Sequence, residues 1–153
     1  MPSAPPLTPI ATLTIQVAAP ITIGHTSAGL RRIVAITGGE VHGPRLNGRI
    51  LPAGADFQTI QPDGFSRLEA RYAIETNDGA MIYIENQGVR FGPPEVMAKI
   101  TRGETVDPAL VYFRTIPRFE TAAPLYQFLT RPLFLGVGAR FPDRVELEIF
   151  EVG

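Results

Sequence analysis

Glycine and proline divide this 153-residue chain into short runs, since it contains 15 residues of each. Most of the runs alternate apolar and polar residues with a period of two, or are rich in Ile, Val, Thr, Phe and Tyr, which is typical of β-strands. In the run 10–18, for example, Leu13, Ile15 and Val17 share one face, and threonine and glutamine side chains share the other. The sequence therefore predicts an all-β domain built from short strands.

Turn motifs predict which strands are neighbours. Asn77-Asp78-Gly79 suits the tight type I′ turn of a hairpin, so the run 65–76 should pair antiparallel with the run 80–91. Pro62-Asp63-Gly64 predicts another turn before this hairpin, because proline presets φ and glycine accepts a positive φ. Gly38-Gly39, inside an apolar run, indicates a bulge, a tight bend or the close approach of another backbone.

The remaining segments complete a closed sheet. The stretch 48–61 is interrupted by glycine and proline and fits two short strands, and two short helices are expected at 95–100 and 124–130. Strands at 110–121, 131–141 and 144–152 follow, which gives roughly eight to ten strands with no βαβ alternation. We expect an antiparallel β-barrel rather than a sandwich, because closure pairs every strand edge and the glycines supply the bends.

Composition excludes several classes of function. The formal net charge of −1 argues against nucleic acid or an anionic membrane as partner, because both need a clustered cationic face. The chain has no cysteine and only two histidines, 17 residues apart without a neighbouring carboxylate cluster, so neither a metal site nor a cysteine nucleophile is expected. No nucleotide-binding loop or acyl-transfer motif is present, so we expect no cofactor.

The length suits one domain, which we place at residues 10–153 after a flexible proline-rich arm at residues 1–9. The first residues show neither a basic leader nor an apolar stretch of signal-peptide length, so we expect a cytoplasmic protein. Self-association as a homodimer is expected only from the general frequency of symmetric oligomers.

Three runs carry a resemblance to a known family: IVAITGGEVHGPRLNGRILPAGAD at 33–56, LEARYAIETNDGAMIYIENQGVRFGPPEVM at 68–97 and VYFRTIPRFET at 111–121. They resemble the family called domain of unknown function 3237, small bacterial and fungal proteins without a settled activity. The resemblance implies a closed antiparallel β-barrel similar to lipocalin-like or allene-oxide-cyclase-like barrels. The family motif usually reads Gly-Gly-Ala-Asp-Trp, whereas this chain has Ala53-Gly54-Ala55-Asp56-Phe57, so an indole with a hydrogen-bond donor is replaced by a phenyl ring.

Polar residues inside strand-like runs are the candidate site, because charges that point into a narrow barrel must pair with each other or meet a ligand. Arg71 and Arg114 would anchor a carboxylate or enolate oxygen, Asp56 or Glu120 would accept a proton and a tyrosine would donate one. The candidate catalytic residues are Asp56, Glu120 and Tyr83, and the candidate binding residues are Arg71, Tyr72, Arg114, Phe57 and Tyr126.

Several of these residues also have a structural interpretation. Arg67, Glu69, Arg71 and Glu75 alternate with apolar residues and fit an outward face of cross-strand ion pairs. Asp56 lies two residues after Gly54 and fits the cap of a turn. The aromatic rings, Tyr126 among them, fit the core before they fit the lining of a site. The sequence leaves these alternatives open.

The sequence therefore predicts a β-barrel that binds a small organic ligand. Cofactor-free proton transfer on an oxygenated organic acid, as in an isomerase, lyase or cyclase, is the candidate reaction, and whether turnover occurs is left open. The alternative is a non-catalytic interaction or assembly module that presents a barrel edge or the proline-rich arm to a partner.

Overall fold

The computed structural model describes all 153 residues and contains nine strands and three short helices. The strands are β1 (Leu7–Val17), β2 (Ile21–Thr26), β3 (Gly29–His42), β4 (Gly48–Ile60), β5 (Ser66–Thr76), β6 (Met81–Phe91), β7 (Tyr112–Glu120), β8 (Phe134–Phe141) and β9 (Arg144–Val152). The helices are α1 (Pro94–Thr101) and two 3₁₀ helices, η1 (Pro108–Leu110) and η2 (Pro124–Leu129).

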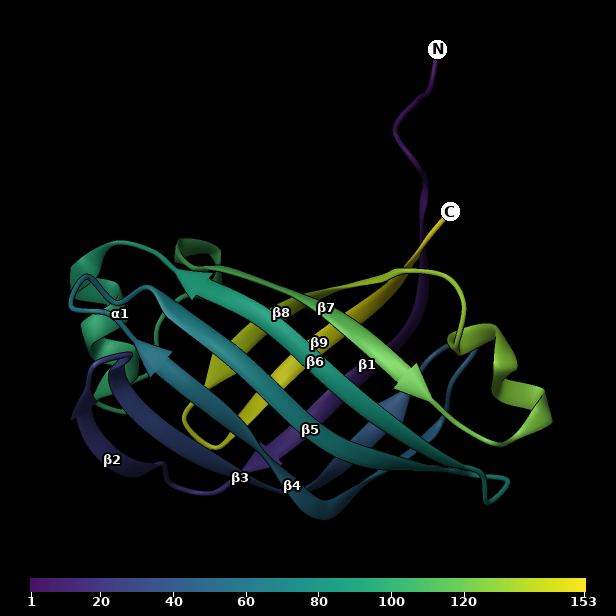
Figure 1. Ribbon diagram of the computed structural model, residues 1–153, viewed down its shortest axis with the longest axis horizontal. Coiled ribbons are helices and arrows are strands. Elements are labelled where there is room, and N and C mark those ends of the chain that lie inside the picture. The colour runs from purple at the N-terminus through teal and green to yellow at the C-terminus, as the bar shows by residue number, and fades with distance from the viewer.

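Eight of the strands close into an antiparallel barrel (Figure 1). Their order is β1-β9-β8-β7-β6-β5-β4-β3, and β1 pairs with β3 to complete the circle. β2 is an additional strand that pairs only with β3. The predicted fold class is thus confirmed, because closure gives every barrel strand two neighbours.

The predicted strands form as expected in all but one segment, and the structure adds β2, which the sequence analysis did not predict. Asn77-Asp78-Gly79 joins β5 and β6 in register, with Glu75 opposite Met81. The two predicted helices are present as α1 and η2. The expectation of two short strands within 48–61 is wrong: β4 is one strand with an irregularity between Ile50 and Gly54, since an irregular stretch of Leu51 to Ala53 takes up the interruption without ending the ladder.

The N-terminal arm is shorter than the proline-rich segment suggests. Residues 1–6 are exposed and extend away from the barrel (Figure 1), whereas Leu7 already pairs with Val152 in β9. No helix in the structure combines the length and apolar character required to cross a membrane.

The two halves of the barrel interior differ in chemistry. Toward η2, at the end opposite α1 in Figure 1, the interior is filled by side chains such as Ile74, Ile82 and Leu129, each at most 1% exposed. Toward α1 and β2, polar side chains share the interior with apolar ones. The apolar half supplies the packed core, so the polar half is the place where a ligand can be received.

Barrel closure depends on a close approach at Gly39 of β3. This residue pairs with Ile15 of β1 on one side and Ile50 of β4 on the other, at φ +144°. A Cβ atom at this position would overlap the carbonyl oxygen of Thr14. The adjacent glycines that indicated a bend or close approach therefore lie where the first and third strands close the sheet.

We predict that Gly39→Ala lowers the free energy of unfolding by more than the about 1–3 kcal/mol that an unfavourable φ alone costs, because the new methyl also meets the Thr14 carbonyl. Gly24→Ala in β2 is the matched control, since Gly24 has φ +125° and open space around it. Urea unfolding of both variants measures the difference. Equal losses would show that the close approach does not limit closure.

Candidate functional site

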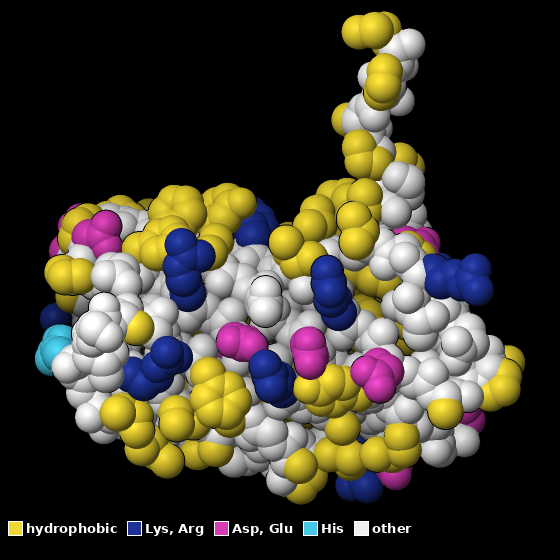
Figure 2. All heavy atoms as spheres, in the orientation of Figure 1, with side chains coloured by type: hydrophobic (Ala, Val, Ile, Leu, Met, Phe, Trp, Pro, Cys, Tyr) yellow, Lys and Arg dark blue, Asp and Glu magenta, His cyan; other side chains and the backbone are white.

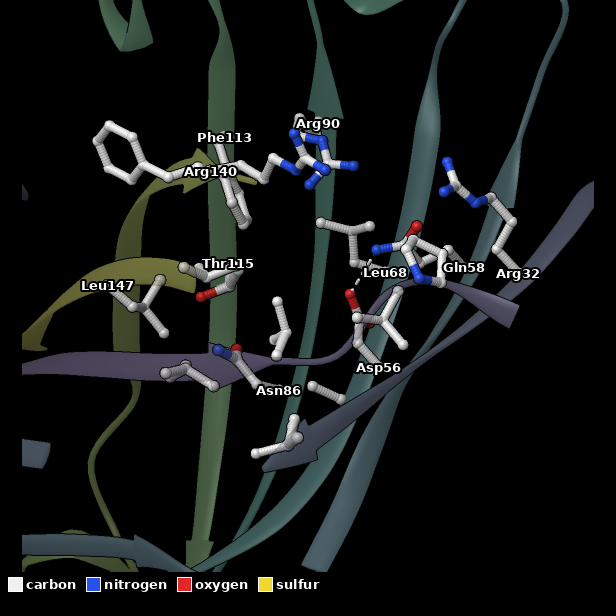
Figure 3. Close-up of a pocket in the computed structure, with 18 of the residues that line it drawn as sticks. Arg32, Asp56, Gln58, Leu68, Asn86, Arg90, Phe113, Thr115, Arg140 and Leu147 are labelled. Carbon is white, nitrogen blue, oxygen red and sulfur yellow. Dashed lines mark hydrogen bonds between the residues drawn. The ribbon is translucent and has the colours of Figure 1, made fainter. Parts of the chain in front are cut away.

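A cavity lies inside the barrel at the end that carries α1 (Figure 3), with a volume of about 70 Å³. A single buried water needs only about 10–15 Å³, so the space accepts several waters or a small organic molecule. Most of its lining is apolar, including Ile15, Leu147 and, from α1, Ile100. The polar lining residues are Arg32, Asp56, Gln58, Tyr72, Asn86, Arg90, Thr115 and Arg140.

Strand alternation positions these side chains. In β6, Asn86 and Arg90 take inward positions in step with Ile82 and Ile84, and all four are buried. The same period of two points Tyr72 of β5 inward between neighbours that face outward. Asp56 and Gln58 are inward in β4, Thr115 in β7, Arg32 in β3 and Arg140 in β8.

Six buried side-chain nitrogen or oxygen atoms lack a hydrogen-bond partner in the structure, and all six belong to this cavity. They are Arg32 Nε, Tyr72 OH, Asn86 Oδ1, Arg90 Nε, Thr115 Oγ1 and Arg140 Nη1. Nearly all buried polar groups in proteins are paired, and an unpaired one costs about 1–3 kcal/mol. The partners of these six atoms must therefore come from the contents of the cavity, either water or a bound molecule.

Asp56 is the only acidic residue of the cavity wall. Its Oδ2 accepts a hydrogen bond from Gln58 Nε2 at 2.8 Å, and its Oδ1 accepts one from the backbone N–H of Glu69 at 3.1 Å. The residue is half-buried and lines the cavity. Desolvation raises the pKa of this carboxyl, although the Gln58 hydrogen bond, the Arg90 charge and the Glu69 N–H each oppose the shift.

Three guanidinium groups share the cavity with this one carboxyl. Burial lowers the pKa of Arg90 to about 10. The charge of Asp56 opposes this shift, and the like charges of Arg140 and Arg32 add to it. Burial also lowers the pKa of Arg32 and of Arg140. All three remain protonated at neutral pH, so the cavity carries more positive than negative charge.

One further contact and one pKa shift define the wall. Arg32 Nη1 donates to the carbonyl oxygen of Thr101 at 3.1 Å, which ties β3 to the end of α1. Burial, and next the charge of Asp56, raise the pKa of Tyr72, so its hydroxyl stays protonated and can donate a hydrogen bond.

Of the eight residues proposed from the sequence, Asp56 and Tyr72 line the cavity. Arg71 pairs on the outer face with Glu69 at 2.8 Å, and the Tyr83 hydroxyl donates to Glu85 at 3.0 Å. The middle of this face carries mixed basic and acidic side chains (Figure 2). The structure also places Phe57, Arg114 and Glu120 at exposed positions.

Tyr126 lies in η2, at the end of the barrel away from the cavity. Its hydroxyl donates to Asp78 Oδ1 at 2.9 Å, and its ring packs against the apolar core.

Exposed apolar side chains also occur in β7 and β8, among them Ile116, Leu135 and Val137. The expected homodimer stays a prediction.

Sequence reasoning missed the residues Arg32, Gln58, Asn86, Arg90, Thr115 and Arg140. A signal for three of them was present, because Asn86 and Arg90 share the face of Ile82 and Ile84 in the predicted strand 80–91, and Arg32 shares the face of Val34 and Ile36. A charged residue in step with buried apolar residues points into the barrel, whereas Arg114 is out of step with the buried Phe113 and Thr115.

A comparison with protein-family models matches residues 5–152 to the family described as "Protein of unknown function (DUF3237)". The chain belongs to this family. A UPF0311 protein of Rhodopseudomonas palustris is 50% identical over 141 residues, which cover 92% of each chain. A UPF0311 protein of Clostridium acetobutylicum is 44% identical over 92% of this chain and 89% of its own length.

Solved structures share the barrel. A conserved protein of unknown function from R. palustris superimposes with a TM-score of 0.94 at 47% identity, covering 100% of both chains. A β-barrel-like protein from Acinetobacter baumannii gives a TM-score of 0.88 at 36% identity, covering 100% of this chain and 99% of that one.

A more distant similarity leads to named enzymes. The hydroalkoxylation enzyme phnH of Penicillium herquei is 33% identical over 60 residues, which are 39% of this chain and 40% of that protein. The structure of an enzyme from the same fungus has a TM-score of 0.75 at 20% identity, covering 100% of this chain and 98% of that one, and at this identity it shows a shared fold.

We predict that Asp56→Asn raises the free energy of unfolding at pH 7. A carboxyl whose pKa is raised by folding destabilises the protein as pH rises from its unfolded pKa through its folded pKa, so the gain should fade below about pH 4. Urea unfolding at pH 7 and pH 3.5 measures the effect.

Asp78 is the matched control. Hydrogen bonds from Thr76 and then Tyr126 lower the pKa of this exposed carboxyl, so Asp78→Asn should lose stability at pH 7 and lose less at acid pH. The same sign of change in both variants at pH 7 would contradict the assignment of Asp56 as a desolvated carboxyl.

Proposed function

We propose that the protein binds a small organic acid in the barrel cavity and moves a proton on it through Asp56. The observation that carries this proposal is the inward cluster of Arg32, Arg90 and Arg140, which has unpaired N–H groups and only one carboxylate opposite it. An anion would pair these donors and offset the surplus charge.

The chemistry of the wall supports an organic acid in particular. Guanidinium groups match the two oxygens of a carboxylate, so Arg90 can donate to it from the most deeply buried position of the three, at 4% exposed. The apolar lining, including Leu68, Phe113 and Leu147, suits a hydrocarbon body rather than an inorganic ion.

Asp56 supports a proton-transfer step. Its ionised carboxylate takes a proton from a C–H next to a ligand carbonyl, or from a ligand hydroxyl, and the electron pair of the broken bond stays on the ligand. An N–H of Arg90 stabilises the negative oxygen that results. The protonated carboxyl then returns the proton to a second ligand atom, so the enzyme is regenerated and the ligand is isomerised, cyclised or cleaved.

The distant relative named for hydroalkoxylation supports the cyclase form of this proposal. Hydroalkoxylation adds an O–H bond across a carbon–carbon double bond, so a proton must leave oxygen and reach carbon. Such a step needs no metal or nucleotide, and a desolvated carboxyl beside a cation supplies the required acid and base.

We predict that the protein binds benzoate and that Arg90→Gln weakens this binding by about tenfold or more, because hydrogen bonds to charged groups contribute about 1.5–3 kcal/mol. Arg71→Gln, which removes an exposed arginine of the outer face, should change the dissociation constant by less than about twofold. Calorimetric titration at pH 7 and constant salt measures both.

Titration of the Asp56→Asn variant with benzoate gives a second test of the same site. Because it removes a negative charge from the cavity, it should tighten benzoate binding. Undetectable binding to the wild type, or equal losses in Arg90→Gln and Arg71→Gln, would reject the cavity as the anion site.

We further predict that the protein accelerates exchange of the methylene protons of phenylpyruvate with D2O, since these protons lie next to a carbonyl. Asp56→Asn should reduce exchange to the buffer rate, whereas Glu120→Gln should leave it unchanged, because Glu120 is exposed and distant from the cavity lining. NMR integration of the methylene signal follows the exchange. A loss in Glu120→Gln alone, or no acceleration by the wild type, would remove Asp56 from this role.

A further inference from the structure

The polar groups of the cavity divide into two ends. Arg90 and Arg140 lie together at one end, Asn86 lies at the other, and Asp56 and Thr115 lie between them (Figure 3). Within β6 the positions of Asn86 and Arg90 are four residues apart on the inner face, which is about 13 Å of strand. The cavity is therefore polar along its length, but cationic at only one end.

The second end is formed by Tyr72 and Asn86, which are 3% and 5% exposed. Tyr72 lies opposite Ile84 in the β5–β6 ladder, and Asn86 is the next inward residue of β6, so the two are diagonal neighbours on the inner face. Neither the Tyr72 hydroxyl nor Asn86 Oδ1 has a protein partner, and the proton transfer assigned to Asp56 uses neither.

The residues next to this end leave the Tyr72 hydroxyl and Asn86 Oδ1 available to a ligand. Ile74, Ile82 and Ile84, which fill the adjoining interior, are all 0% exposed and have no polar side-chain atoms. Asp56 is engaged by Gln58 and by the backbone N–H of Glu69.

We propose that the ligand is a hydroxylated organic acid bound lengthwise, with its carboxylate at the arginines and a hydroxyl group between Tyr72 and Asn86. This inference rests on the proposed function and names its substrate class. The Tyr72 hydroxyl donates to the ligand oxygen, and the ligand O–H donates to Asn86 Oδ1.

A hydroxyl satisfies this end better than a charged group does. A second carboxylate would lie near Asp56 without a cation of its own. An ammonium group has no lone pair to accept the hydrogen bond of Tyr72, whose hydroxyl stays protonated. Because a hydroxyl both donates and accepts, it is the simplest group that pairs both unsatisfied atoms.

The test compares two acids with their hydroxylated forms: benzoate with 4-hydroxybenzoate, and 3-phenylpropionate with 3-(4-hydroxyphenyl)propionate. The two pairs of acids differ in the distance between carboxylate and hydroxyl, so they test two separations between the arginines and the Tyr72–Asn86 end. In the wild type we expect the hydroxyl to tighten binding at least about tenfold at one of the lengths, because a site built to pair a hydroxyl discriminates strongly against its absence. Calorimetric titration gives each dissociation constant.

Tyr72→Phe and Asn86→Leu should reduce that advantage to less than about twofold while leaving the constants of the unhydroxylated acids nearly unchanged. Tyr72→Phe removes an oxygen that has no partner in the folded chain, so the variant should fold as the wild type does, which urea unfolding verifies. Tyr83→Phe, at an exposed tyrosine of β6, is the matched control and should keep the full advantage.

Two outcomes would overturn the inference. One is binding of the unhydroxylated acids with no gain from the hydroxyl at either length, which leaves the acid-binding function intact. The other is a hydroxyl advantage that survives in both Tyr72→Phe and Asn86→Leu. Failure of all four acids to bind would instead reject the proposed function, and with it this substrate class.

Discussion

Three guanidinium groups and one carboxylate share the interior of a narrow barrel, and the proposed function depends on this imbalance of charge. Burial makes each charge costly unless it is paired. Desolvation accordingly lowers the pKa of Arg90 to about 10 and raises the pKa of Asp56. The proposed anionic ligand and the proposed proton transfer by Asp56 both rest on this imbalance.

The barrel creates this situation by dividing its interior along its length. Backbone groups of the closed sheet pair with each other, so side chains alone decide what the interior offers. The half toward η2 is packed with aliphatic side chains, which stabilise the fold and leave the half toward α1 free to hold polar groups. The TM-score of 0.94 to the R. palustris structure shows that the family shares the framework on which the site is built.

The fold could be predicted from local signals, whereas the site required long-range register. Asn77-Asp78-Gly79 determines the β5–β6 hairpin through turn chemistry alone, and alternation in β5 already separates Arg71 from Tyr72. Asp56 was a candidate and lies on the cavity, whereas Arg114 was a candidate although it is out of step with the buried Phe113. Arg32 was missed although it alternates in step with Val34 and Ile36, which are buried in β3. Arg140 had no such signal, because Gly136, Gly138 and Ala139 beside it define no large apolar face in the sequence.

The most direct measurement is a crystal structure of the protein with 4-bromobenzoate, using anomalous scattering to locate the bromine. Our account predicts the bromine inside the barrel, with the carboxylate within hydrogen-bonding distance of Arg90 and the ring against the apolar wall. Bromine found only on the outer surface, with the inward arginines making no contact to the acid, would contradict it.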